Sequence, residues 1–258
     1  MSSTAPLNVV QLGRYGDILN ILPMVEYKAR TRPVNLFVST EFASPFVDLP
    51  YCNTHALPFR FEQVKAAIEH VSRLEGELII SQVWGDHQPS PRTANFCFDS
   101  WTTLSEGEPR SSTRWEFGRP CLTRCPRREA ELLSHVDVPP GGILVNLSGQ
   151  SAPMKDAHSL YASILRHLPH VVNLGSLKAS RLQDLLCLYD KYHTLITVDT
   201  ATLHLAKNHT GLRIVQLRPD HGWDWSKAPR MPNAMCVLGY DEAVRTADQW
   251  LPPLRRTA

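Results

Sequence analysis

Long apolar stretches are missing from this chain of 258 residues. No run of about 18 apolar residues occurs in it, which excludes a membrane-spanning helix. The first residues, Met1 to Pro6, lack the basic region and the apolar stretch of a secretory signal. We therefore expect a protein without stable membrane insertion that works in a cytoplasm, either bacterial or, for a viral protein, that of the host.

An excess of either charge is missing too, and lysine is scarce. The formal net charge is +2, so bulk charge selects no partner. The 27 basic residues comprise 20 Arg and 7 Lys. A guanidinium group grips phosphates and carboxylates with paired hydrogen bonds, so this bias fits an anionic ligand. A GC-rich genome produces the same bias without any function.

Cysteine is sparse and forms no metal-binding pattern. Only Cys121 and Cys125 of the six cysteines lie close together in the sequence, and no second pair completes a zinc site. We expect reduced, structural thiols and no bound metal.

Internal repeats and low-complexity tails are also absent, and short apolar strands alternate with helices instead. This alternation implies an α/β fold with parallel sheets and right-handed crossovers. The expected strands are 7–12, 34–39, 77–83, 142–147, 171–174, 194–198 and 213–217, and the expected helices are 16–30, 61–74, 158–167, 180–192 and 201–209.

A cluster of helix and strand breakers, Asp137-Val-Pro-Pro-Gly-Gly142, divides this pattern into two parts. We predict two Rossmann-like domains facing a cleft, a compact one over residues 1–138 and a second over residues 139–258. Ligands of open parallel sheets bind where strands run into the following helices. Three such junctions carry polar residues.

The first junction is Gly13-Arg-Tyr-Gly-Asp17, between the first expected strand and its helix. Asp17 would either cap the helix, as Asp commonly does, or act as a general base toward an incoming hydroxyl. No third glycine follows in register, so the segment is no dinucleotide fingerprint.

The second junction is Leu147-Ser148-Gly149-Gln150-Ser151, with Lys155 four residues further on. Hydroxyl and backbone N–H groups of such a loop suit phosphate oxygens, and Lys155 would add a positive charge. A plain solvated loop is the alternative.

The third junction is Val198-Asp199-Thr200-Ala201-Thr-Leu-His204-Leu-Ala206. The start of a helix suits a diphosphate, and His204 lies one helical turn beyond Thr200, on the same side. The alternative is that Asp199 or Thr200 is only an N-cap and His204 a packed helix residue.

Together, and in this order, these motifs resemble glycosyltransferase family 9, which includes the heptosyltransferases of the lipopolysaccharide inner core. Arg14-Tyr-Gly-Asp17 with Ile-Leu-Asn-Ile-Leu-Pro23 resembles its N-terminal motif, and Asp199-Thr-Ala-Thr-Leu-His204-Leu-Ala206 its C-terminal signature. The resemblance covers residues 7–30 and 142–218.

The resemblance implies a GT-B fold and an inverting transfer that needs neither metal nor cofactor. Asp17 would be the general base, and the donor's diphosphate would be held at the second and third junctions. Ala201 stands where the family usually has glycine, and Asp184 is the candidate for the acid that holds the nucleotide ribose. The residues carried over as diphosphate-binding are Ser148, Gly149, Lys155, Asp199, Thr200, Ala201 and His204.

The acceptor side has arginines with interleaved tryptophans, a composition that can track a phosphate backbone and stack an exposed base. Arg14 belongs to this side as well. The basic residues of the stretch are Arg110, Arg114, Arg119, Arg124, Arg127 and Arg128, and Trp115 lies among them.

Three functions follow from these features. The first, slightly favoured, is transfer of a sugar to a hydroxymethylated pyrimidine in DNA, a viral type of DNA modification. The second is a heptosyltransferase-like enzyme of lipopolysaccharide or other saccharide assembly. The third is a sugar-nucleotide binding protein without catalysis.

Overall fold

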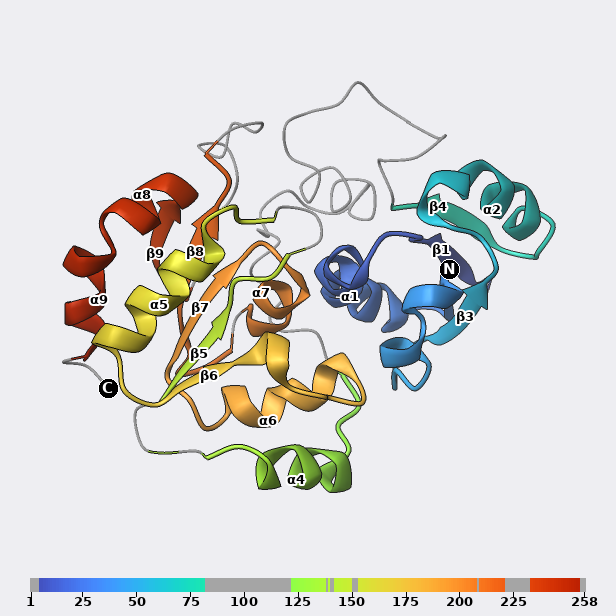
Figure 1. Ribbon diagram of the computed structural model, residues 1–258. Helices are drawn as coiled ribbons and strands as arrows, with labels where there is room; N and C mark the ends of the chain where they lie inside the picture. Colours follow the sequence, from blue (N-terminus) through green and yellow to red (C-terminus); the bar gives the residue numbers. More distant parts are fainter. Residues whose placement is uncertain are drawn as a thin grey trace. The chain divides into compact units, whose positions relative to one another are not determined.

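Two compact units, each with one parallel sheet, make up the chain (Figure 1). The computed structural model describes residues 5–81, 122–137, 139, 142–149, 153–207, 209–220 and 233–255. The first unit runs to Thr123, and the second begins at Arg124. This division falls before the predicted boundary at residue 138, because helix α4 packs on elements of the second unit.

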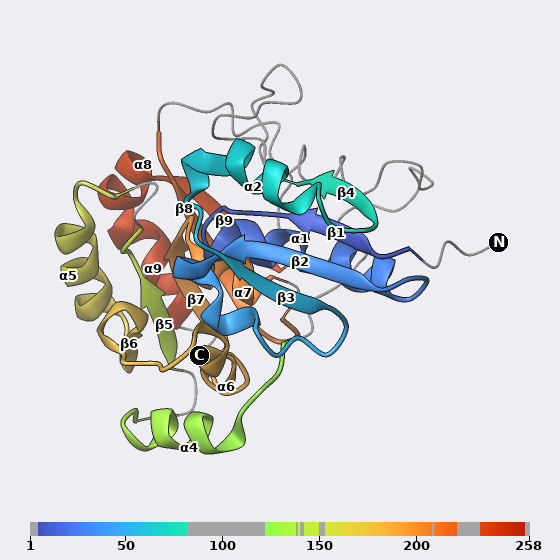
Figure 2. The same ribbon diagram turned by 90° about the vertical axis from the view of Figure 1, so that its right-hand side faces the viewer.

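The first unit holds a sheet in the order β3-β2-β1-β4, in which all strand pairs are parallel. Figure 2 shows β1, β2 and β3 side by side. The strands are β1 (Leu7–Val10), β2 (Val34–Ser39), β3 (Asn53–Leu57) and β4 (Glu77–Ile80), and the α-helices are α1 (Tyr15–Ala29) and α2 (Val64–Val71).

Alternation along the strands places apolar side chains on both faces of this sheet. Val10 and Phe37 pack with Val64 and Ala67 of α2 in one cluster. Helix α1, which packs against β2, buries eight consecutive residues from Ile18 to Val25. A helix buried along such a stretch is covered on all sides.

The second unit holds a sheet in the order β6-β5-β7-β8-β9, again with parallel pairs only. Its strands are β5 (Ile143–Asn146), β6 (Val171–Asn173), β7 (Thr194–Val198), β8 (Arg213–Arg218) and β9 (Ala234–Gly239). Its helices are α4 (Pro126–Ser134), α5 (Ala157–His167), η4 (Leu174–Ser176), η5 (Leu182–Leu185), α6 (Leu186–Tyr189), α7 (Ala201–Ala206), α8 (Tyr240–Arg245) and α9 (Ala247–Arg255).

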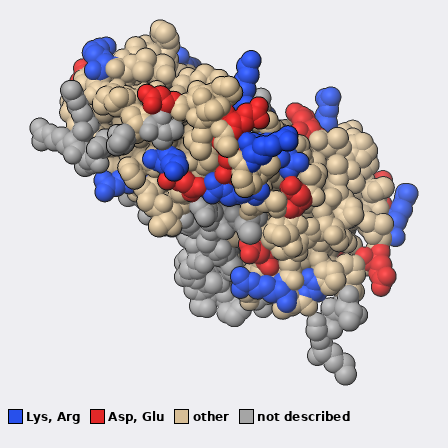
Figure 3. Space-filling view, turned by 90° about the horizontal axis from the view of Figure 1, so that it is seen from below, with Lys and Arg blue, Asp and Glu red and all other residues tan. Residues whose placement is uncertain are grey.

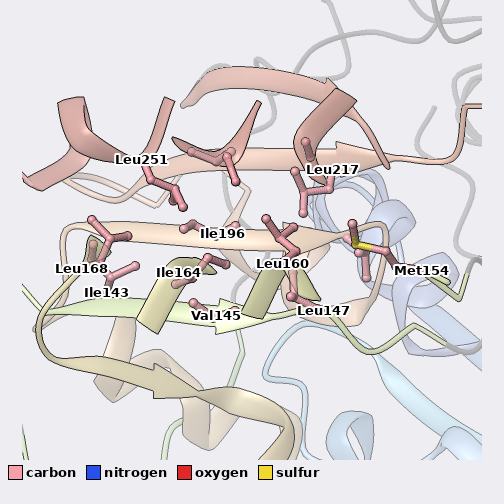
Figure 4. Close-up of a cluster of buried hydrophobic side chains, with 14 of the residues drawn as sticks. Ile143, Val145, Leu147, Met154, Leu160, Ile164, Leu168, Ile196, Leu217 and Leu251 are labelled. Atoms are coloured by element: carbon pink, nitrogen blue, oxygen red, sulfur yellow. The ribbon is translucent and has the colours of Figure 1, made fainter. Parts of the chain in front are cut away.

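Helices α5, α8 and α9 cover one face of this second sheet and enclose its core (Figures 1 and 4). Leu160 and Ile164 of α5 are fully buried there, together with Ile196 of β7 and Leu251 of α9. The expected α/β fold with two parallel-sheet regions is confirmed.

Three predicted helices are shorter in the structure. The helix expected over 61–74 is the 3-10 turn η3 (Phe61–Gln63) followed by α2, which ends at Val71. The segment expected as a helix over 180–192 is the 3-10 turn η5 followed by the single turn α6. The helix expected over 201–209 ends at Ala206, because Lys207 has a ψ of 128° and leaves the helical conformation. None of the described helices is long and apolar enough to cross a membrane.

The packing of α5 on the sheet predicts that two leucines of this helix contribute very differently to the free energy of unfolding. Leu160→Ala should lower the free energy of unfolding by about 2–5 kcal/mol, because it removes a fully buried side chain. Leu165, which is 52% exposed, is the matched control, and its replacement by Ala should change that energy by less than about 0.5 kcal/mol. Urea unfolding followed by circular dichroism measures both, and equal effects would contradict the assignment of the core.

Candidate functional site at the carboxyl ends of the strands

The order of the strands marks one place in each sheet where a ligand is expected. Successive strands are added in one direction and then in the other, and the reversal lies between β1 and β4 in the first unit and between β5 and β7 in the second. In open parallel sheets, ligands bind beyond the carboxyl ends of the strands at such a reversal. Each unit is described by itself below.

In the second unit, Asn146 joins the two loops at this reversal. Its Nδ2 atom donates to Thr202 Oγ1 at 3.0 Å and to Thr200 Oγ1 at 3.4 Å, and its Oδ1 atom accepts from the N–H of Ser148 at 3.0 Å. Asn146 is 8% exposed. The loop after β5 and the start of α7 are therefore held as one piece.

Thr200 caps helix α7. Its hydroxyl accepts a hydrogen bond from the N–H of Thr202 at 3.2 Å. The fully buried Tyr189 donates from its hydroxyl to the carbonyl of Thr202 at 3.0 Å. The capping role predicted as an alternative for Thr200 is thus present, and its Oγ1 atom lies at the carboxyl edge of the sheet.

Asp199 and His204 form a pair beside this cap. His204 Nε2 lies 3.2 Å from Asp199 Oδ1, with the side chains 14% and 30% exposed. The other ring nitrogen, Nδ1, is buried without a hydrogen-bond partner among the described residues. A carboxylate on one ring nitrogen fixes the orientation of an imidazole.

The remaining residues predicted for diphosphate binding differ in their exposure to solvent. Ser148 is exposed, and Gly149 and Ala201 are half-buried. A Cβ atom at Gly175 would lie 3.4 Å from Ser148 Oγ, so η4 borders the same loop. Lys155 is exposed.

Two residues that the sequence did not single out lie at the neighbouring strand ends. Asp220, after β8, accepts from the N–H of Asp241 at 2.6 Å. Tyr240, after β9, is 8% exposed. Burial first, and then the negative charges of Asp199 and Asp220, raise the pKa of Tyr240 to about 12, so it stays a neutral hydroxyl. Strand β9 was not expected, and Tyr240 follows it directly.

In the first unit, Asp17 lies in the first turn of α1 at the β1–β4 reversal. Its Oδ2 atom accepts from the N–H of the exposed Arg14 at 2.9 Å and so caps the start of the helix. Gly13 is required here, because a Cβ atom would lie 2.5 Å from Asp17 Oδ2. The capping role, predicted as one of two, is present.

Gln11 performs in this unit the task that Asn146 performs in the other. Its Oε1 atom accepts from the N–H of Gly13 at 2.9 Å, and its Nε2 atom donates to the carbonyl of Ser81 at 3.2 Å. The loop that carries Asp17 is thereby tied to the residue that follows β4. No sequence signal distinguishes Gln11 from an ordinary polar residue at a strand end.

The arginines named for the acceptor side divide into two groups. Arg124 pairs with both oxygens of Glu129 at 2.7 Å and with Asp190 at 2.6 Å, and Arg128 pairs with Asp184 at 3.0 Å. These contacts fasten α4 to η5 and α6. Arg127 is exposed, and Arg14 lies in the first unit. The remaining residues predicted for this side lie outside the described residues: Arg110, Arg114, Trp115 and Arg119.

Asp184, the candidate for holding the ribose, is part of the same packing. It is 1% exposed, and it also accepts from the N–H of Arg181 at 3.0 Å. Among the described ranges, no three His, Cys, Asp or Glu side chains are placed to hold a metal ion.

Because Asn146 joins two loops by hydrogen bonds, we expect its truncation to destabilise the folded state. Asn146→Ala should lower the free energy of unfolding by about 1–3 kcal/mol, because it removes the hydrogen bonds of a buried amide to Thr200, Thr202 and Ser148. Asn173, whose Oδ1 accepts only from Gly175 N at 3.0 Å in an exposed turn, is the control, and its loss should cost less. Chemical unfolding compares the two, and a larger cost for Asn173→Ala would contradict this role.

The α4 ion pairs predict a dependence on pH. Burial alone would raise the pKa of Asp190, but the hydrogen bond and charge of Arg124, followed by those of His209, bring it below its usual 3.8. A depressed carboxyl pKa stabilises the fold above the unfolded value and ceases to do so as pH falls through the folded value. The stability difference between the unmodified chain and Asp190→Asn should therefore be present at pH 7 and shrink below about pH 4. A difference that stays constant down to pH 2 would contradict this.

Comparisons with known proteins agree with this architecture. No protein-family model and no curated protein sequence matches the chain. A glycosyltransferase of family 9 from Veillonella parvula has a TM-score of 0.61 at 15% identity, over 96% of this chain and 90% of that one.

Two E. coli structures are similar in the same way. ADP-heptose lipopolysaccharide heptosyltransferase II has a TM-score of 0.59 at 12% identity, over 98% of this chain and 100% of that one. Heptosyltransferase WaaC with ADP has a TM-score of 0.56 at 9% identity, over 98% of this chain and 100% of that one. The chain therefore has the fold of the family 9 heptosyltransferases, a GT-B fold, as the resemblance implied.

Proposed function

We propose that this chain is a glycosyltransferase that moves a sugar from a nucleotide-diphosphate sugar to a hydroxyl of an anionic acceptor. The observation that carries the proposal is the group Asp199, Thr200 and His204 at the strand reversal of the second unit. This group stands where ligands of parallel sheets bind, in a chain with the fold of solved glycosyltransferases.

The donor would lie at the carboxyl edge of the second sheet. Ser148 and Thr200 would offer hydroxyl donors to the diphosphate, and the imidazole of His204, oriented by Asp199, would add a polar ring beside it. Lys155 on its exposed segment would add a positive charge. A solved neighbour of the same fold contains ADP, which supports a nucleoside diphosphate as the ligand of this edge.

The reaction would be a single displacement with inversion. An acceptor hydroxyl oxygen attacks the anomeric carbon, its proton passes to the carboxylate of Asp17, and the bond from that carbon to the diphosphate breaks. The electron pair of that bond leaves with the diphosphate, where preorganised donors give the largest stabilisation. The proposal assigns this stabilisation to Lys155 and His204, and it uses neither a metal nor a cofactor.

For the acceptor, we propose an anionic saccharide of the lipopolysaccharide type. One solved neighbour is a lipopolysaccharide heptosyltransferase by name, another is a heptosyltransferase, and this likeness favours the class. The DNA acceptor, slightly favoured by the sequence, gains no support from the described residues, because Arg124 and Arg128 are paired with acids. On the face seen in Figure 3, basic and acidic side chains alternate.

A transfer assay by mass spectrometry tests the proposal. The chain is given nucleotide-diphosphate sugars, in the presence of EDTA, with either lipopolysaccharide core oligosaccharide or duplex DNA containing 5-hydroxymethylcytosine. A sugar-sized mass gain on the oligosaccharide is the expected result. A gain on DNA would reassign the acceptor, and donor binding without any transfer would leave a binding protein.

The role of Asp17 predicts a specific loss. Asp17→Asn keeps an oxygen that accepts from Arg14 N–H, so the fold and the donor affinity should be unchanged. Turnover should fall by about 10²–10⁴-fold, because the proton acceptor is gone.

Asp17→Ala is the comparison variant, since it also removes the helix cap, at a cost of about 0.5–2 kcal/mol. Undiminished turnover of Asp17→Asn would show that Asp17 is only a cap. Kinetics, donor titration and thermal unfolding of the three proteins separate these outcomes.

A further inference from the structure

A buried asparagine on α1 has an amide nitrogen without a hydrogen-bond partner in the described part of the chain. Asn20 is 2% exposed, and its Nδ2 atom makes no hydrogen bond to any of the residues that the structure describes. Such groups are rare, because an amide moved out of water without a partner destabilises the folded state. Folding therefore does not account for an asparagine at this position.

Asn20 lies within an otherwise apolar stretch. Its neighbours Leu19 and Ile21 are buried, and the stretch continues from Ile18 to Val25. An apolar side chain of similar size would satisfy every packing requirement of these positions. The polar amide is the exception in this part of the helix.

The helix geometry relates Asn20 to the proposed catalytic base. Asn20 follows Asp17 by three residues, so the two side chains lie on the same face. Side chains of a helix tilt toward its N-terminus, and the amide of Asn20 therefore extends over the turn that contains Asp17.

We propose that Asn20 is an acceptor-binding residue, whose amide donates a hydrogen bond to an oxygen of the acceptor beside the hydroxyl that Asp17 deprotonates. The inference rests on the proposed function, because it requires an acceptor at Asp17. Binding of the acceptor would supply the hydrogen bond that the empty protein lacks. The amide thus favours the complex at the expense of the unliganded fold.

The test replaces Asn20 by leucine, which has nearly the same size and no polar group. Replacement of an unsatisfied buried amide by an apolar side chain should raise the urea midpoint of the unliganded chain. The same variant should lose about tenfold or more in kcat/KM for lipopolysaccharide core oligosaccharide, the probe acceptor. The affinity for the donor should not change.

Met24→Leu is the matched control. Met24 is fully buried one turn further along α1, and this swap of similar volume should leave kcat/KM unchanged. It reports any general effect of repacking the helix.

The opposite results are distinguishable. A lower urea midpoint for Asn20→Leu would show that the amide serves the fold, and an unchanged kcat/KM would show that no acceptor uses it, so either overturns the inference. If the unmodified chain transfers sugar to neither the oligosaccharide nor hydroxymethylated DNA, the proposed function fails and the inference falls with it. If the unmodified chain transfers sugar but Asn20→Leu has a lower urea midpoint or an unchanged kcat/KM, the inference about Asn20 is refuted and the proposed function stands.

Discussion

An amide side chain that spans the strand reversal is the contact on which both candidate sites depend. Asn146 binds Ser148 and Thr202 in the second unit, and Gln11 binds Gly13 and the carbonyl of Ser81 in the first. Loops at the carboxyl edge of a parallel sheet have backbone groups that no neighbouring strand can pair. One amide, with a donor and an acceptor, satisfies groups of two loops at once. The shape of each loop, and hence the position of Asp17 or of the α7 cap, follows from that single side chain.

The acids of the second unit are held by neighbouring groups, as the proposed diphosphate site requires. A carboxylate beside a diphosphate would repel it unless its charge were already engaged. Asp199 lies against His204, Asp220 accepts an N–H at the start of α8, and Asp184 is paired with Arg128. Of these, only Asp199 lies at the strand reversal itself, where it orients the imidazole of His204. The remaining acids serve the packing of helices.

The sequence was sufficient for the fold, because its strands are β-branched runs that end in glycine or capping residues, as at Gly13 and Thr200. It was insufficient where a contact depends on register. Strand β3 has the polar sequence Asn53–Leu57 and is exposed on an edge, so no apolar pattern marks it. The pairing of Arg124 and Arg128 with acids depends on the docking of α4, and Gln11 and Asn146 acquire their role only from the neighbouring strand.

Two buried asparagines show how satisfaction of a polar group separates structure from function. Asn146 uses both atoms of its amide, and a part of the fold depends on it. Asn20 is more deeply buried, yet its amide nitrogen has no partner in the described part of the chain. Hydrogen bonding explains the first residue completely. The amide nitrogen of the second residue destabilises the folded state, because no hydrogen bond replaces its contact with water. We explain such a residue by a partner that is present only when the protein works.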